Sequence, residues 1–396
     1  MVEAIEKLKM LGPATRYEPA EDVDMMGNRQ ESAGRVPADL RHCISHATLP
    51  GGRRVPMLKT LVSSACEMNC RYCAFRVGRD FQRATFTPDE LAYLSHRMYG
   101  LGLVKGVFLS SGLVGGGVRT QDRLIATAEL LRRKYHFHGY LHLKIMPGAE
   151  RDQVAETMRW ANRVSLNLEA PNERRLSKLA PKKEFSGELL ERLKWVHALR
   201  QQAPEVAPST TTQFVVGPAG ESDVELLMTC AYLYRHLGLA RAYFSGFSPV
   251  VDTPLENHPP IVLRREQRLY QASFLLRDYG FDVEDLPFDQ QGQLPLSEDP
   301  KLAWARRHLQ EAPIEVNTAD REMLLRVPGI GPKSADKIVS ARRKGTLRSA
   351  CDLRNLGIAT KRILPFVLLD GRQSPRQLSL WSVSPSMHAQ PRARAA

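Results

Sequence analysis

The sequence predicts an α/β fold followed by a small all-α domain. Six runs rich in β-branched and aromatic residues alternate along residues 55–247 with segments that carry apolar residues at helical spacing. Strands that alternate with helices are typical of a parallel sheet with helical crossovers. In the last quarter, two short helical patterns flank a Gly-Ile-Gly turn, which predicts a separate helical hairpin.

The helical crossovers are predicted from capping residues and from periodicity. Thr87 precedes Pro88 and two acidic residues, a pattern typical of a helix N-terminus. Residues 124–134, 189–200 and 221–236 carry apolar side chains at helical spacing. The six predicted strands span residues 55–61, 106–112, 138–145, 163–169, 210–216 and 242–247.

Composition excludes several classes of protein. The chain has 396 residues, of which 43% are hydrophobic and 25% charged, as in ordinary globular proteins. No stretch approaches the roughly 20 continuous apolar residues of a membrane span. The first residues mix acids and bases without an apolar segment, so no secretory signal is expected. We therefore expect a cytoplasmic protein that makes no membrane contact.

The net charge of +13 is concentrated at one end of the chain. Residues 301–396 hold 18 Lys and Arg against 7 Asp and Glu, whereas residues 1–300 carry a balance of only +2. A basic terminal quarter on a nearly neutral body predicts a binding surface for a polyanion, most often nucleic acid. A solubilising tail is the alternative that charge alone leaves open.

Three of the six cysteines, Cys66, Cys70 and Cys73, lie within eight residues. Without an export signal, clustered thiols indicate a metal more often than a disulfide. A structural zinc ion takes four ligands, usually from two pairs of cysteines, and the sequence has no second closely spaced pair. Three thiolates suit a four-iron cluster in which one iron stays open to a small molecule. Zinc and inert core thiols remain the alternatives.

The run Cys66-Glu-Met-Asn-Cys70-Arg-Tyr-Cys73 resembles the signature of radical S-adenosylmethionine enzymes, in which an aromatic residue, here Tyr72, precedes the last cysteine. The resemblance implies an open, partial (β/α)6 TIM-like barrel and a [4Fe–4S] cluster on the three cysteines. It also implies that S-adenosylmethionine binds the open iron and is cleaved to a 5′-deoxyadenosyl radical, with the electron supplied by a donor.

In (β/α) barrels, chemistry gathers at the carboxyl ends of the strands. Here those ends are polar, and the resemblance implies that they bind S-adenosylmethionine. Where the family carries Gly-Gly-Glu, this chain has Ser110-Ser111-Gly112, so backbone carbonyls or a hydroxyl are expected to contact the amino group. Glu169 is expected to bind the ribose. The full set expected to bind S-adenosylmethionine is Tyr72, Ser110, Ser111, Gly112, Lys144, Ser165, Asn167, Glu169, Gln213 and Gly217.

Residues 314–345 closely resemble the helix-hairpin-helix motif of DNA-repair proteins. Asn317 or Thr318 is expected to begin the first helix, which Pro328 ends. Glycines let the backbone N–H groups of the turn approach a phosphate, and the next helix adds its dipole. Such a module holds DNA without reading its sequence; a protein-interaction hairpin is the alternative. The residues expected to bind phosphate are Gly329, Ile330, Gly331 and Lys333.

The order of motifs resembles one branch of the family: radical S-adenosylmethionine proteins with a C-terminal helix-hairpin-helix, described as DNA modification or repair proteins. The resemblance implies an enzyme acting on DNA, and a uracil-DNA-glycosylase-like protein partner. An RNA-modifying radical enzyme and a non-catalytic DNA-binding protein with a structural iron–sulfur cluster are the alternatives.

The expected domain boundaries follow the motifs. They are an N-terminal extension (1–50), the barrel (51–260), a helical segment and linker (261–311), the helix-hairpin-helix domain (312–370) and a disordered tail (371–396).

Overall fold

The computed structural model describes residues 2–11, 43–48, 54–204 and 207–373. The remainder of the expected N-terminal extension and residues 374–396 of the expected tail lie outside the described residues. The chain divides into two compact units. Unit 1 comprises residues 1–277 and 281–300, and unit 2 comprises residues 278–280 and 301–396.

Unit 1 is built on one seven-stranded sheet whose strands follow their order in the sequence. Six neighbouring strands are parallel, and the first pairs with the second in the antiparallel sense. The predicted α/β fold, a partial (β/α)6 barrel, is confirmed. The strands are β1 (Ile44–Thr48), β2 (Arg54–Leu61), β3 (Gly106–Ser110), β4 (Tyr140–Lys144), β5 (Arg163–Ser165), β6 (Ser209–Val216) and β7 (Arg241–Gly246).

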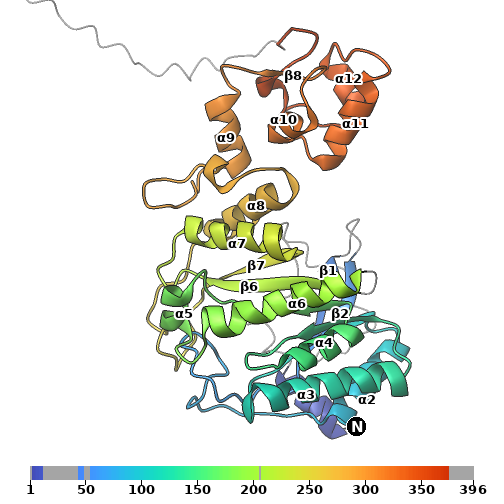
Figure 1. Cartoon of the computed structure of the whole chain (residues 1–396), viewed down its shortest axis with the longest axis vertical. Coiled ribbons are helices and arrows are strands. Elements are labelled where there is room, and N and C mark those ends of the chain that lie inside the picture. The colour runs from blue at the N-terminus through green and yellow to red at the C-terminus, as the bar shows by residue number, and fades with distance from the viewer. Residues whose placement is uncertain (1, 12–42, 49–53, 205–206, 374–396) are drawn as a thin grey trace, which may run out of the picture. The chain divides into compact units, whose positions relative to one another are not determined.

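The helices that connect these strands lie along the outer side of the curled sheet (Figure 1). Thr87 caps α2 in a capping box with Glu90, as the sequence predicts. The helices of unit 1 are α1 (Val2–Leu11), α2 (Pro88–Gly100), α3 (Gly116–Glu129), α4 (Arg151–Trp160), α5 (Glu173–Leu179), α6 (Glu191–Gln202), α7 (Asp223–Leu237) and α8 (Leu263–Asp278). Shorter helical turns are η3 (Leu130–Lys134), η4 (Phe185–Leu190) and η6 (Val283–Asp285).

The core of unit 1 lies between the sheet and these helices. Leu109, Val164, Phe214 and Phe244 are completely buried, one on each of four parallel strands. Strands buried on both faces carry continuous apolar runs, which is why the sequence marks them clearly. β1 was missed because it is a short edge strand, Ile-Ser-His-Ala-Thr, with little apolar character.

Unit 2 is mainly helical and matches the predicted hairpin. Its first hairpin helix begins after Asp320, whose side chain accepts a hydrogen bond from the Met323 N–H at 2.7 Å. The expected cap at Asn317 or Thr318 is therefore wrong: Asn317 instead bonds the backbone of Leu347. The elements are α9 (Pro300–His308), β8 (Ile314–Glu315), α10 (Arg321–Arg326), α11 (Pro332–Arg342), α12 (Ala350–Asn355), η7 (Leu364–Phe366) and β9 (Val367–Leu368), with β8 and β9 paired in parallel.

Within the described residues, no helix is long and apolar enough to cross a membrane.

The contact between α3 and the loop after β4 leaves no room for a side chain at Gly117. A Cβ there would collide with the backbone of Pro147 and Gly148. Gly117→Ala should therefore lower the free energy of unfolding by about 1–3 kcal/mol. Gly100→Ala, at the end of α2 where a Cβ meets nothing within 4 Å, is the control and should change it by less than about 0.5 kcal/mol. Urea denaturation measures both, and equal effects would contradict the close approach.

Candidate functional site

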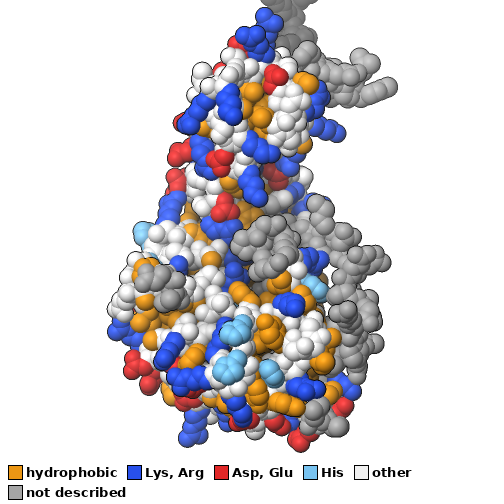
Figure 2. Space-filling view, turned by 90° about the vertical axis from the view of Figure 1, so that its right-hand side faces the viewer, with side chains coloured by type: hydrophobic (Ala, Val, Ile, Leu, Met, Phe, Trp, Pro, Cys, Tyr) orange, Lys and Arg blue, Asp and Glu red, His pale blue; other side chains and the backbone are white. Residues whose placement is uncertain are grey.

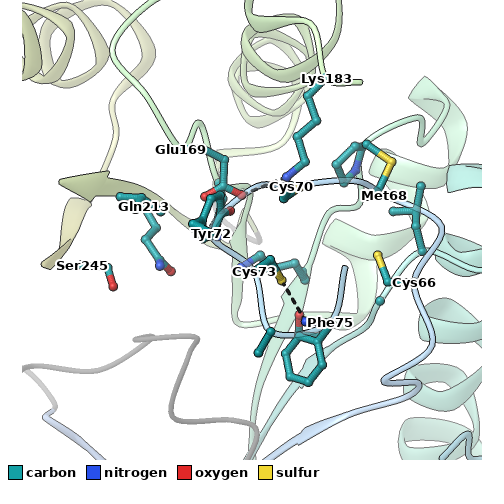
Figure 3. Close-up of a pocket in the computed structure, with 18 of the residues that line it drawn as sticks. Cys66, Met68, Cys70, Tyr72, Cys73, Phe75, Glu169, Lys183, Gln213 and Ser245 are labelled. Atoms are coloured by element: carbon teal, nitrogen blue, oxygen red, sulfur yellow. Dashed lines mark hydrogen bonds and ion pairs between the residues drawn. The ribbon is translucent and has the colours of Figure 1, made fainter. Parts of the chain in front are cut away.

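A cavity of about 480 Å³ opens at the carboxyl ends of the parallel strands (Figure 3). Its wall is formed by the loop after β2 and by the ends of the strands that follow. Because parallel strands end at the same edge of a sheet, residues far apart in sequence meet here. Cys66, Cys70 and Cys73 all line this one cavity.

Backbone hydrogen bonds hold the cysteine loop. The Glu67 N–H donates to the Leu113 carbonyl at 2.9 Å, and the Arg71 N–H donates to the Leu179 carbonyl at 2.7 Å. The Cys73 Sγ accepts a hydrogen bond from the Phe75 N–H at 3.4 Å, drawn as a dashed line in Figure 3. The loop is thus fixed to neighbouring connections on both sides.

The guanidinium of Arg83 fixes the segment that follows the third cysteine. It donates four hydrogen bonds of 3.0 to 3.2 Å to backbone carbonyls. A planar guanidinium with several N–H groups is suited to gathering carbonyls that no strand or helix satisfies. The four acceptors are the carbonyls of Ser64, Phe75, Arg76 and Arg79.

Gly112 lets the end of β3 approach the cysteine loop. Its N–H donates to the Ser63 carbonyl at 2.7 Å, and a Cβ at this position would collide with the Ala65 carbonyl and touch Cys66. Glycine is therefore needed at this position for close approach.

The three thiols are free, and their surroundings are only partly polar. Burial raises the pKa of the Cys70 thiol, and the charge of Lys183 opposes that rise. Among the described residues, no group of three His, Cys, Asp or Glu side chains converges closely enough to hold a single metal ion. The thiolates of an iron–sulfur cluster bind different irons and need not converge on one atom.

Glu169 lies at the cavity in an unusual backbone conformation. Its φ is +65°, yet its N–H bonds the Gln213 carbonyl at 2.9 Å and its carbonyl accepts from the Val215 N–H at 2.8 Å. A non-glycine residue held in the left-handed region is strained, and such residues cluster at functional sites. The strand network thus fixes the direction in which this carboxylate points.

The carboxylate of Glu169 is 3% exposed and pairs with Lys183, with Oε1 2.9 Å from Nζ. Burial alone would raise the pKa of Glu169, but the charge and hydrogen bond of Lys183, together with the nearby Lys144 and Tyr72, lower it. Burial would likewise lower the pKa of Lys183, but Glu169 and Cys70 raise it. The second oxygen, Oε2, has no hydrogen-bond partner among the described residues. A buried acceptor beside a cavity fits a ligand hydroxyl.

Lys183 is a site residue that sequence reasoning missed. It lies between α5 and η4 rather than at the end of a strand, so the rule that located the other residues passes over it. The sequence does hold a local signal for this connection, because Pro181-Lys182-Lys183 follows one helix and precedes another. Only the fold shows which lysine turns inward: Lys182 is exposed and bonds the Glu67 carbonyl at 3.2 Å.

Most of the residues expected to bind S-adenosylmethionine line the cavity. Two do not. The Ser165 hydroxyl forms a hydrogen bond of 2.9 Å with Nε2 of His142, a buried residue that does not line the cavity. The Gly217 N–H donates to the carboxylate of Glu221. Burial, with Arg163 nearby, lowers the pKa of His142 well below its usual value, so this ring is neutral. The residues that line the cavity are Tyr72, Ser110, Ser111, Gly112, Lys144, Asn167, Glu169 and Gln213.

The cavity also has an apolar wall that the sequence did not indicate. Met68 and Phe75 come from the cysteine loop, and Phe247 and Val250 come from the segment after β7. Arg79 connects the two segments, since its Nε donates to the Val251 carbonyl at 3.0 Å.

In unit 2, the expected phosphate-binding residues form the turn between α10 and α11. Gly329 is exposed and has a φ of +93°, which favours glycine. Gly331 precedes α11, which has no side-chain cap, and Lys333 is exposed in its first turn. The Ile330 side chain, by contrast, is buried, and its N–H donates to the Val327 carbonyl. Lys and Arg side chains are frequent on the face of this unit shown in Figure 2.

Residues 60–233 match the model of the radical SAM superfamily, and residues 310–357 match that of the helix-hairpin-helix motif. The chain therefore contains a radical SAM domain, an enzyme domain whose cofactors are a [4Fe–4S] cluster and S-adenosylmethionine, and a helix-hairpin-helix motif.

An uncharacterized protein of Methanocaldococcus jannaschii is 24% identical over 219 residues, which are 52% of this chain and 53% of that protein. This chain thus matches about half the length of that relative. The [FeFe]-hydrogenase maturase HydG of Carboxydothermus hydrogenoformans aligns with a TM-score of 0.43 and 14% identity, over 56% of this chain and 51% of HydG. Methylornithine synthase (PylB) aligns with a TM-score of 0.44 and 16% identity, over 56% of this chain and 61% of PylB.

The buried pair of Glu169 and Lys183 predicts a strong and non-additive effect on stability. Lys183→Met leaves a buried carboxylate unpaired and should lower the free energy of unfolding by about 3–5 kcal/mol. Adding Glu169→Gln to it should restore part of that loss. Lys182→Met, one residue away and exposed, is the control and should cost less than about 0.5 kcal/mol. Urea denaturation at neutral pH measures these three variants and Glu169→Gln alone; strictly additive effects of the two pair mutations would show that the side chains are not coupled.

Proposed function

We propose that this protein is a radical S-adenosylmethionine enzyme that modifies or repairs DNA. The observation that carries the proposal is the combination, in one chain, of three cysteines that line one cavity and a glycine turn at a helix N-terminus in a basic domain. The first feature supplies the chemistry, and the second supplies the affinity for a polyanion.

We propose that Cys66, Cys70 and Cys73 hold the [4Fe–4S] cluster. They line the same cavity, and the loop that carries them is fixed by backbone hydrogen bonds and by Arg83. Three protein ligands leave one iron open. When bound, the cluster and S-adenosylmethionine supply a 5′-deoxyadenosyl radical that can remove a hydrogen atom from a substrate.

The polar residues of the cavity fit the parts of S-adenosylmethionine. Oε2 of Glu169 has no partner among the described residues and is suited to accept from a ribose hydroxyl. Lys144, 7% exposed and part of the cavity wall, carries a charge suited to a carboxylate. The Ser110-Ser111-Gly112 stretch lacks the family's glutamate, so we propose that oxygen atoms of this stretch contact the amino group.

The rest of the wall protects a reactive intermediate. Met68, Phe75, Phe247 and Val250 present apolar surface to the same cavity. Such a wall keeps water and stray hydrogen donors away from the reacting groups. We propose that the substrate nucleotide enters on this side, and that a base in duplex DNA leaves the stack to do so.

The helix-hairpin-helix motif is the basis for choosing DNA. The exposed Gly329, the half-buried Gly331 at the uncapped start of α11 and the exposed Lys333 together present N–H groups and a positive charge to a phosphate. These contacts do not read bases, so we propose binding without sequence preference. RNA is the second candidate, because a phosphate contact does not by itself exclude a 2′-hydroxyl.

Two partners and a location complete the proposal. An electron donor must reduce the cluster, and the family resemblance adds a uracil-DNA-glycosylase-like protein. All six cysteines are free, which accords with a reducing compartment such as the cytoplasm.

The proposed cluster ligands predict a sharp distinction between cysteines. After anaerobic reconstitution, Cys66→Ala, Cys70→Ala and Cys73→Ala should each lose the cluster's visible absorption and form no 5′-deoxyadenosine from S-adenosylmethionine. Cys351→Ala, at an exposed position in unit 2, is the control and should retain both. An intact cluster in the wild type with no 5′-deoxyadenosine formed would favour a structural cluster and contradict the enzyme.

The proposed phosphate contact predicts binding that weakens steeply with salt. For the full chain and a fluorescent DNA duplex, the logarithm of the association constant should fall linearly with that of the salt concentration. Lys333→Met should weaken binding and reduce the slope by about one. Competition with RNA of the same sequence tests the alternative, since preferential displacement by RNA would favour an RNA substrate.

A further inference from the structure

A lysine outside the matched motif donates a hydrogen bond to the turn of the helix-hairpin-helix. Lys301 lies at the start of α9, nine residues before the matched range of 310–357 begins. Its side chain is only 9% exposed, and its Nζ donates a hydrogen bond to the Ile330 carbonyl. The same Nζ lies 4.5 Å from the centroid of the Tyr279 ring. All three residues belong to unit 2.

A buried ammonium group requires a reason. Removing a charge from water is costly unless hydrogen bonds and nearby partners compensate for it. Here the Ile330 carbonyl and the face of the Tyr279 ring contribute to that compensation. An apolar side chain could fill the same space, but it could not donate a hydrogen bond to the turn.

The hydrogen bond fixes the orientation of one peptide group. The bond between Ile330 and Gly331 is trans, as are all peptide bonds described. In a planar trans peptide the C=O and the N–H point in opposite directions. Because the Ile330 carbonyl faces Lys301, the Gly331 N–H points away from it.

The Gly331 N–H is also available. It donates to no residue in the described part of the chain. The next residue, Pro332, has no N–H, and α11 has no side-chain cap. A Cβ at Gly331 would lie 3.3 Å from the Tyr279 hydroxyl, so Tyr279 is next to this residue. Gly331 thus offers a hydrogen-bond donor at the N-terminus of α11, a helix of eleven residues.

We infer that Lys301 is a positioning residue for nucleic-acid binding: it holds the Ile330 carbonyl inward and thereby directs the Gly331 N–H at a backbone phosphate. This inference rests on the proposed function of the turn. The inference adds α9 to the part of unit 2 that takes part in binding, although Lys301 itself does not contact the nucleic acid.

Binding measurements with the full chain separate positioning from direct contact. Lys301→Met should weaken binding to a DNA duplex about tenfold, since one donor to a charged phosphate is misdirected. The slope of affinity against salt should stay that of the wild type, because no phosphate charge is lost. Lys301→Arg keeps a charged donor and should retain most of the affinity. The matched control is Lys333→Met, which should lower the slope by about one.

The outcomes are distinguishable. If Lys301→Met lowers the slope as Lys333→Met does, Lys301 contacts phosphate directly and the inference is wrong. If Lys301→Met binds as the wild type does while Lys333→Met is weakened, the inference is also wrong, although the proposed function stands. If the wild type shows no salt-dependent binding, the proposed function fails, and the test below decides the orientation of the peptide independently.

Nuclear magnetic resonance tests the orientation in the wild type, so the result does not depend on whether a variant folds. Ile330-Gly331 is the only Ile-Gly step in the sequence, so ¹³C-carbonyl isoleucine and ¹⁵N-glycine select this amide alone. In the free protein the Gly331 amide should exchange rapidly with solvent, and a DNA duplex should slow that exchange. Strong protection without DNA would show that the N–H points inward and would overturn the inference.

Discussion

The ion pair between Glu169 and Lys183 joins three parts of the candidate site that no strand ladder connects. Glu169 continues the line of β5, Lys183 comes from the connection between α5 and η4, and the charge of Lys183 acts on Cys70 in the loop after β2. Each charge is buried, so each depends on the other to remain in place. The carboxylate keeps one oxygen for a ligand because the lysine occupies the other. The contact therefore helps to hold these three parts around the cavity.

Much of the architecture was predictable because buried parallel strands and capped helices leave local patterns. All six parallel strands were located, and the cap at Thr87 was identified from its neighbours. The edge strand β1 was not, since a strand exposed on one side needs few apolar residues. Asp320, rather than Asn317, caps α10 because several residues before that helix can cap, and tertiary contacts with Leu347 hold Asn317 elsewhere.

The spacing of Cys66, Cys70 and Cys73 was enough to single them out, and all three line the cavity; that they bind a cluster stays a prediction. Residues at strand ends were found in part. The Ser165 hydroxyl bonds His142, and the Gly217 N–H donates to Glu221. These contacts depend on side-chain rotamers and backbone torsions, which the sequence does not indicate. Lys183 and Lys301 were missed for one shared reason. Both are buried lysines whose partners lie 14 and 29 residues away along the chain, so only the fold reveals them.

The four carbonyls gathered by Arg83 have a consequence for how the protein acquires its inorganic group. A loop that is disordered without metal must lose its conformational freedom when the metal binds, and that loss weakens binding. Here the segment from Ser64 to Arg79 is already tied to one guanidinium. These hydrogen bonds restrict the segment before any ligand is considered, so they lower the entropic cost of binding iron and sulfide there.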